Sequence, residues 1–243
     1  RIARPTQTHT RIDSSSSKML TQDQLQRYEQ DGFLVVKQLL TLSECQKLKT
    51  TVDRLIDDWE PEQDYSWMFP HGQTKERSMD QELIDSGDTI SFFIENDAVD
   101  PQTVQSHRDS TYILSEPFKA VGIWIALEDA TIENGCLWFI PGSNSTTTKR
   151  RCIRNPNEQE FNDGKVLIFQ GEEEYDDSAF IPVEVKAGDA ILIDGQVVHK
   201  SEQNKSPQTR QICAFHIFET HNSTYSKENW LQTATSFPLL YDD

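Results

Sequence analysis

Two short apolar runs flank a polar segment in the stretch Gly122-Ile-Trp-Ile-Ala-Leu-Glu-Asp-Ala-Thr-Ile-Glu-Asn-Gly-Cys-Leu-Trp-Phe-Ile-Pro-Gly-Ser143. The first run is rich in β-branched and aromatic residues, and the second ends at the turn pair Pro141-Gly142. Short apolar runs bounded by turn residues are typical of buried strands. We therefore predict strands over Val121–Leu127 and Leu137–Ile140.

The same pattern continues downstream. Turn signals such as Asn162-Asp163-Gly164 and Ala187-Gly188-Asp189 separate further apolar runs. Several short strands at this spacing indicate a mainly β protein, a sandwich or a barrel. The sequence has no glycine-rich phosphate loop, which argues against a dinucleotide-binding fold. The further predicted strands are Val166–Phe169, Phe180–Val185, Ala190–Ile193 and Ile212–Phe218.

Two capping boxes predict the starts of two N-terminal helices. Thr21 with Gln24 opens the first, and Thr41 with Glu44 opens the second, with a strand predicted at Phe33–Val36 between them. We interpret an apolar stripe on the second helix as core packing. From this start we predict a single domain over residues 19–243. The stripe consists of Leu48, Val52, Leu55, Ile56 and Trp59.

Residues 1–18 differ in composition from the rest of the chain. They hold four basic residues, one acid and a run of four serines. This composition fits a transit peptide, a leader or tag, or a disordered tail. Of these, we expect a disordered leader or tag.

The net charge limits the classes of partner. The chain has 243 residues and a formal net charge of −17. An acidic surface repels phosphate backbones and anionic lipids, so we expect neither nucleic acid nor a membrane as a partner. The four cysteines form no CxxC pair. We expect reduced thiols in a cytoplasmic protein, or a mitochondrial one if residues 1–18 are a transit segment.

The motif His107-Arg108-Asp109 places an imidazole and a carboxylate two residues apart. On a strand such residues point to the same face and can hold one metal ion from one side. His199, which follows the apolar run from Ala190, completes a set of two histidines and one carboxylate. This ligand set leaves adjacent coordination positions open, as iron(II) oxygenases require. Each motif alone is common, and it is their order on an all-β background that favours an iron site.

Arg210 lies eleven residues after His199. The dicarboxylate 2-oxoglutarate chelates iron through its oxo-acid end, and its distal carboxylate then needs a charged, planar partner. Arginine suits that geometry better than lysine. We therefore predict 2-oxoglutarate as the cosubstrate.

The sequence resembles the phytanoyl-CoA dioxygenase family, from Thr21 to Glu95 and again from Gln105 to Tyr241. The resemblance implies a double-stranded β-helix, or jelly roll, with N-terminal helices packed on one sheet. It is densest between Gly122 and Ser143. The most specific pieces are Asn134-Gly135-Cys136-Leu137, Pro141-Gly142-Ser143, Ala187-Gly-Asp189 and His199-Lys-Ser201.

The resemblance also implies an activity. His107, Asp109 and His199 would bind Fe(II). The protein would use 2-oxoglutarate and O2, with ascorbate as the reductant, to hydroxylate a small organic substrate. A carboxylate at the position of Asp109 favours hydroxylation, whereas Gly or Ala there would favour a halogenase. Two further residues would join Arg210 at 2-oxoglutarate: Ser201 at the distal carboxylate, and Trp124 in the pocket wall. From the residues alone, core packing is the preferred interpretation of Trp124, and a turn hydroxyl is the alternative for Ser201.

One departure from the family concerns the stretch before the HxD motif. Family members have several dozen more residues there, whereas here Asp100-Pro101-Gln102 runs almost directly into Gln105-Ser106-His107. This departure raises the alternative of a catalytically impaired deletion form that keeps the fold. Asn144 replaces a histidine that many relatives carry, and we expect little consequence because it lies outside the triad.

Other interpretations remain open. A metal-binding β-barrel could hold another ion, and an acidic loop from Glu172 to Asp177 could serve an interaction module or simply be solvated. A basic cluster could receive phosphates or a carboxylate, or be an exposed loop. The prime substrate and the oligomeric state cannot be derived from the sequence. The basic cluster consists of Lys149, Arg150, Arg151 and Arg154.

Overall fold

The computed structural model describes residues 19–58, 104–232, 237 and 239–240. Three features discussed above lie outside these residues: the expected leader at residues 1–18, Trp59, and the stretch before the HxD motif up to residue 103. The N-terminal part contains α1 (Gln22–Asp31), β1 (Phe33–Val36) and α2 (Leu42–Asp57). The part from residue 104 contains β2 (Val104–His107), the 3-10 turn η5 (Asp109–Thr111), β3 (Ser115–Glu116), β4 (Ala120–Ala126), β5 (Leu137–Phe139), η6 (Ser143–Ser145), β6 (Arg151–Arg154), α4 (Glu158–Asn162), β7 (Leu167–Gln170), η7 (Asp177–Ala179), β8 (Ile181–Val183), β9 (Ala190–Asp194), β10 (His199–Ser201), β11 (Ile212–Phe218) and β12 (Thr224–Tyr225).

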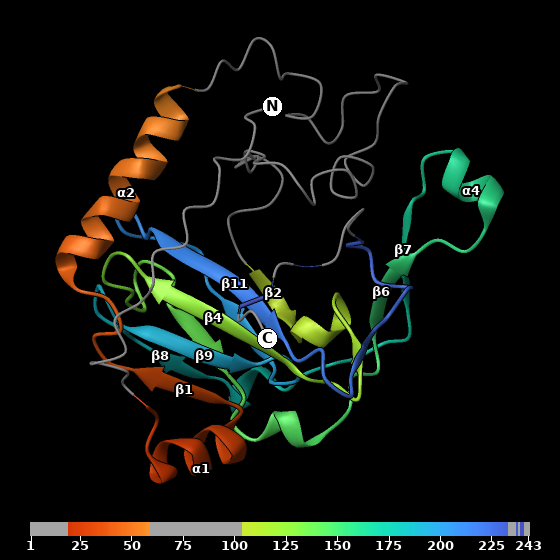
Figure 1. The fold of residues 1–243 in the computed structure, drawn as a ribbon, viewed down its shortest axis with the longest axis horizontal. Helices are drawn as coiled ribbons and strands as arrows, with labels where there is room; N and C mark the ends of the chain where they lie inside the picture. Colours follow the sequence, from red (N-terminus) through yellow and green to blue (C-terminus); the bar gives the residue numbers. More distant parts are fainter. Residues whose placement is uncertain (1–18, 59–103, 233–236, 238, 241–243) are drawn as a thin grey trace.

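Two four-stranded antiparallel sheets form the centre of the molecule. One has the strand order β1-β9-β4-β11, and the other has the order β2-β10-β5-β8. A separate pair, β6 and β7, extends away from these sheets and carries α4 at its outer end (Figure 1). The described part of the chain is thus mainly β with few helices, as the sequence predicts. None of its helices is both long and apolar enough to cross a membrane.

The main core lies between the two sheets. Trp124 and Ala126 of β4 pack with Ile191 of β9 and with Leu137 and Phe139 of β5. Because these residues come from both sheets, the sheets face each other across the core. The alternate residues of β4 form a second cluster on the opposite face. Strand β4 is therefore buried on both faces, which explains its unbroken apolar sequence.

Helix α2 covers part of that second face. Its residue Cys45 is 2% exposed and belongs to the cluster that contains Ile123 and Ile125 of β4. The predicted core packing of the apolar stripe is wrong for three of its members, since Leu48, Val52 and Ile56 are 39%, 42% and 49% exposed. Among the described residues, the helix is buried against the sheet only through its first turn.

A buried carboxylate joins the end of β1 to the start of β9. Asp189 is 2% exposed and accepts hydrogen bonds from Lys37 Nζ (2.9 Å), Gln38 N (2.9 Å) and Lys186 N (3.0 Å). The preceding Gly188 has φ +90°, and a Cβ there would lie 2.3 Å from a backbone oxygen. The Ala-Gly-Asp turn therefore holds the end of β1 against the start of β9.

We predict that Asp189→Ala destabilises the protein by about 2 kcal/mol, because three hydrogen bonds to one charged acceptor are lost. Urea denaturation monitored by circular dichroism measures this change. Asp57→Ala removes an exposed carboxylate from the end of α2 and serves as the control. Equal unfolding free energies for the two variants would contradict the role of Asp189.

Candidate metal centre

Three potential metal ligands converge where β2 and β10 pair. His107 ends β2 and lies opposite His199, the first residue of β10, with ring centroids 4.4 Å apart. Asp109 Oδ1 lies 3.7 Å from His107 Nε2 and 3.6 Å from His199 Nε2. Arg108 between them has extended backbone (φ −113°, ψ 142°), so His107 and Asp109 share a face although the strand has already ended. All three ligand atoms lie within 4.8 Å of one another.

Hydrogen bonds at Nδ1 determine the tautomers of His107 and His199. His107 Nδ1 lies 2.8 Å from the backbone oxygen of Gln105, and His199 Nδ1 lies 3.2 Å from that of Val197. A carbonyl oxygen only accepts hydrogen bonds, so each Nδ1 carries the proton and donates. Each Nε2 then has a free lone pair on the side of Asp109, as a metal ligand requires.

Burial and mutual contact set the charges of these groups. Asp109 is 8% exposed and His199 is 6% exposed. Burial alone would raise the pKa of the Asp109 carboxyl, but the adjacent His199 ring and close contacts with His107 and His216 hold it well below its usual range. Burial, with the nearby His107 ring, lowers the pKa of His199 to about 4. At neutral pH the carboxylate is ionised and His199 is neutral, which are the states that bind metal.

A third histidine, His216, contacts the other oxygen of the carboxylate. Its Nε2 lies 3.1 Å from Asp109 Oδ2 and donates to it, which leaves Oδ1 facing His107 and His199. His216 lies on β11 opposite Gly122 of β4. A Cβ at Gly122 would lie 3.2 Å from the same Oδ2, so glycine leaves room for the carboxylate. Sequence reasoning missed His216, and the available signal was a polar residue inside the predicted strand Ile212–Phe218.

Arg108, the middle residue of the HxD motif, points away from the ligands and is 3% exposed. Its Nε pairs with Glu173 Oε1 at 2.9 Å. The guanidinium thereby connects the HxD motif to three other segments of the chain, those around Ser143, Glu173 and Gln196. Sequence reasoning missed this role as well. Its other partners are the backbone oxygens of Ser143, Thr146 and Gln196 and the Thr146 hydroxyl.

The residues predicted for 2-oxoglutarate lie near the start of β5. Ser201 pairs with Leu137 and is 2% exposed, and its Oγ has no hydrogen-bond partner among the described residues. Arg210 lies beside Gly135, where an added Cβ would be 3.6 Å from Nε. Its guanidinium carbon is 5.9 Å from the ring centre of Trp124, which is 6% exposed and belongs to the main core. Trp124 thus packs in the core and faces Arg210 as well.

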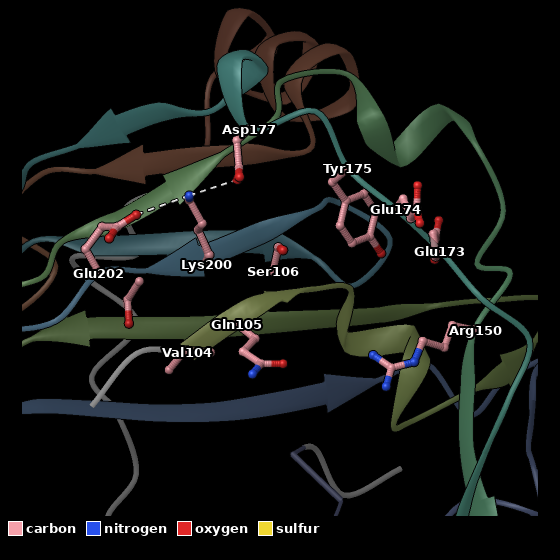
Figure 2. A pocket seen from close by; sticks show the side chains of 11 residues that line it. Val104, Gln105, Ser106, Arg150, Glu173, Glu174, Tyr175, Asp177, Lys200 and Glu202 are labelled. Atoms are coloured by element: carbon pink, nitrogen blue, oxygen red, sulfur yellow. Dashed lines mark hydrogen bonds and ion pairs between the residues drawn. The ribbon is translucent and has the colours of Figure 1, made fainter. Parts of the chain in front are cut away.

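A cavity of about 560 Å³ lies beside β2 and β10 (Figure 2). The predicted acidic loop forms one of its walls. Most of that loop is exposed, but the Glu173 side chain is only 8% exposed because it pairs with Arg108. The cavity is lined by Val104, Gln105, Ser106, Arg150, Glu173, Glu174, Tyr175, Asp177, Lys200, Ser201 and Glu202.

Residues 81–212 match the family described as Phytanoyl-CoA dioxygenase (PhyH). The chain belongs to this family. Phytanoyl-CoA dioxygenase domain-containing protein 1 of Bos taurus is 31% identical over 293 positions, which cover 91% of this chain and 99% of that protein. Phytanoyl-CoA dioxygenase 1 of Oryza sativa subsp. japonica is 39% identical over 140 residues, 58% of this chain and 47% of that protein.

Solved structures share the fold of this phytanoyl-CoA dioxygenase family member. The epimerase SnoN, in complex with Fe3+, alpha ketoglutarate and nogalamycin RO, is 18% identical with a TM-score of 0.54, over 91% of each chain. EvdO2 from Micromonospora carbonacea var. aurantiaca, complexed with 2-oxoglutarate, is 15% identical with a TM-score of 0.50, over 90% of this chain and 96% of that one. At these identities the likeness concerns the fold.

The alignment with the Bos taurus relative also reveals a difference in length. It spans 293 positions, 50 more than the 243 residues of this chain. At least 50 positions of the alignment therefore have no counterpart here. This agrees with the expectation that the chain is several dozen residues shorter than its family. The expected location of the gap, before the HxD motif, falls largely on residues outside the described part.

We predict that His216→Leu weakens binding of Co(II), a spectroscopic substitute for Fe(II), by about 10- to 100-fold, because the carboxylate loses the partner that orients it. Calorimetric titration and the visible spectrum of bound Co(II) measure the effect. His216→Gln retains an N–H donor and should restore most of the affinity. His221→Leu, at an exposed position, is the control. Unchanged affinity in a folded His216→Leu protein would contradict the prediction.

We predict that the metal-free protein loses stability through His199 as the pH falls from 6.5 to 4. The pKa of His199 is about 4 when folded, against about 6.5 in an unfolded chain. Between these pH values His199 is protonated in the unfolded state but not in the folded state. The free energy of unfolding therefore decreases as the pH is lowered, by about 2–3 kcal/mol over this range.

Urea denaturation at pH 7 and pH 4.5 tests this, with His199→Gln beside the wild type. The variant lacks the group and should lose less stability between the two pH values. His221→Gln should behave like the wild type. Equal losses in wild type and His199→Gln would show that His199 is not a buried neutral ring.

Proposed function

We propose that this protein is an Fe(II)- and 2-oxoglutarate-dependent dioxygenase that hydroxylates a small organic substrate. The convergence of His107 Nε2, His199 Nε2 and Asp109 Oδ1 carries this proposal. Both imidazoles present a lone pair, and the carboxylate is ionised and buried between them. Two imidazoles and one carboxylate match iron(II) better than Ca2+ or Mg2+, which take oxygen ligands.

The residues near β5 fit 2-oxoglutarate. Burying a hydroxyl without a hydrogen-bond partner destabilises a protein by about 1–3 kcal/mol. The unpaired Ser201 Oγ therefore supports binding of a ligand atom at this position. In the proposal Ser201 donates to the distal carboxylate and Arg210 neutralises its charge, beside the wall that Trp124 forms. The planar guanidinium suits a bidentate contact with that carboxylate.

When bound, iron, 2-oxoglutarate and O2 would supply the oxidation, with succinate, CO2 and a hydroxylated substrate as products, and ascorbate would serve as the reductant that keeps the iron as Fe(II). The protein contributes binding, orientation and protection from water. His107, Asp109 and His199 hold the metal from one side and leave adjacent positions open. His216 and Gly122 keep the Asp109 carboxylate in one orientation. The burial of Asp109 and His199 would limit the access of water to the metal.

The finer description of the fold belongs to the same proposal. We infer a double-stranded β-helix with the N-terminal helices packed on one sheet, which the two facing sheets and Cys45 support. We also infer a single domain over residues 19–243, a leader at residues 1–18, and a cytoplasmic location, mitochondrial if that leader is a transit segment.

A specific observation favours a second candidate function. At least 50 positions of the Bos taurus alignment have no counterpart in this chain. Residues near the HxD motif would normally contribute substrate and cosubstrate contacts in the family. The alternative is a catalytically impaired form that keeps the fold and the metal.

The proposal predicts succinate formation from 2-oxoglutarate by the purified protein with Fe(II), ascorbate and O2. His107→Ala should abolish it by removing a metal ligand. Arg210→Ala should raise the KM for 2-oxoglutarate at least about tenfold, because the distal carboxylate loses a charged partner. Succinate is measured by NMR.

His221→Ala is the control and should match the wild type, since His221 is exposed. Absence of succinate from the wild type, with Co(II) still bound, would favour the impaired form. Absence of both would overturn the metal site itself.

A further inference from the structure

The structure divides the predicted basic cluster into residues with different surroundings. Arg151 Nη2 donates to Asn229 Oδ1 at 3.2 Å, and Arg154 Nε donates to the backbone oxygen of Trp230 at 3.1 Å. These two residues join strand β6 to the C-terminal segment. Lys149 is exposed. Arg150 is half-buried and borders the cavity beside β2, so it is the member of the cluster that a ligand in the cavity would meet.

Arg150 has no anionic partner among the described residues. Its guanidinium carbon lies 3.9 Å from the ring centre of Phe169, and no hydrogen bond or ion pair accompanies this cation–π contact within the described part of the chain. Figure 2 shows the guanidinium extending into the cavity on the side of Gln105. A half-buried cation that stacks on a ring but pairs with no acid still has its hydrogen-bond donors available.

A row of aromatic rings connects Arg150 to the metal site. Phe169 packs edge-on against Tyr112, with ring centroids 6.2 Å apart, and Tyr112 packs edge-on against His107 at 5.6 Å. Phe169 is 50% exposed and Tyr112 is half-buried. An exposed ring in such a position offers an apolar surface to a ligand. The row therefore runs from His107 to Arg150, and Arg150 is the member of this series that lines the cavity.

The acids around the cavity are mostly neutralised by other residues. Glu173 pairs with Arg108. Lys200 binds both Asp177 (3.2 Å) and Glu202 (3.1 Å), as the dashed lines in Figure 2 show. Among the lining residues this leaves one exposed carboxylate, Glu174, without an ion pair in the described structure. Arg150 is thus the cation of the cavity that remains available to an anionic ligand.

We propose that the prime substrate is a small organic anion with an apolar or aromatic body. Its anionic oxygens bind Arg150, and its body lies along Phe169 and Tyr112 toward His107. This inference rests on the proposed function, because it defines the substrate of that site. An arginine recognises a carboxylate and a phosphate through the same charge-assisted hydrogen bonds, so both are sources of the anionic group.

Binding of small probes tests the proposal without any turnover. The probes are 3-phenylpropanoate and phenethyl phosphate, with 3-phenylpropanamide as the neutral analogue. The protein is saturated with Zn(II) and 2-oxoglutarate, so that the probes do not compete for Arg210. Ligand-observed NMR gives the Kd values. At least one anion should bind the wild type about tenfold more tightly than the amide; the two anionic arms show which group is preferred.

Matched variants assign the effect to the proposed residues. Arg150→Gln should remove the preference for the anion and leave the Kd of the amide within about twofold, as expected when only a charge-assisted contact is lost. Lys149→Gln should retain the preference, because that neighbouring cation lies outside the cavity lining. Phe169→Ala should weaken anion and amide alike. Glu174→Gln should retain or increase the preference.

Two results would overturn the proposal: an undiminished preference in Arg150→Gln, or no binding of any probe to the wild type. Neither depends on catalysis. Failure of the proposed function would instead appear as an absence of succinate in the Fe(II) assay, so the two outcomes are distinguishable.

Discussion

The buried carboxylate of Asp109 is the constraint on which the rest of the site depends. An ionised carboxylate that is 8% exposed is stable only if hydrogen bonds or opposite charges compensate for the loss of water. Here Oδ1 faces two imidazoles and Oδ2 accepts from a third. A bound divalent ion would add a positive charge next to this carboxylate. In the proposed function, the metal would therefore complete the charge balance of this buried site.

The two facing sheets contribute opposite sides of this pocket. His107 and His199 come from the β2-β10-β5-β8 sheet, whereas Gly122 and His216 come from the β1-β9-β4-β11 sheet. Asp109 lies between them, so its orientation depends on how the sheets pack. A change in the β4–β11 register by one residue would turn His216 away from the carboxylate. The core between the sheets thus holds the site together as well as the fold.

The sequence allowed prediction of features that depend on local pattern. Strand Ile212–Phe218 has the predicted bounds, and both capping boxes are present, because apolar runs and caps are local properties. The polar strands β6 and β10 were missed, since short basic or His-Lys-Ser segments carry no apolar signal. The three candidate metal ligands could be predicted from their residue types and spacing, and the structure brings them together. The role of His216 depends on its pairing with Gly122, and one sequence does not specify strand register.

Because this chain is shorter than its relatives, metal binding and substrate binding could be affected differently in it. All the contacts described for the metal and 2-oxoglutarate residues are made between residues 105 and 216. The missing positions therefore remove none of these contacts, and a chain shortened in this way retains its donor set. Any impairment of the shorter chain would then arise outside this donor set. Normal metal affinity combined with weak turnover would accordingly locate the effect of the deletion outside the triad.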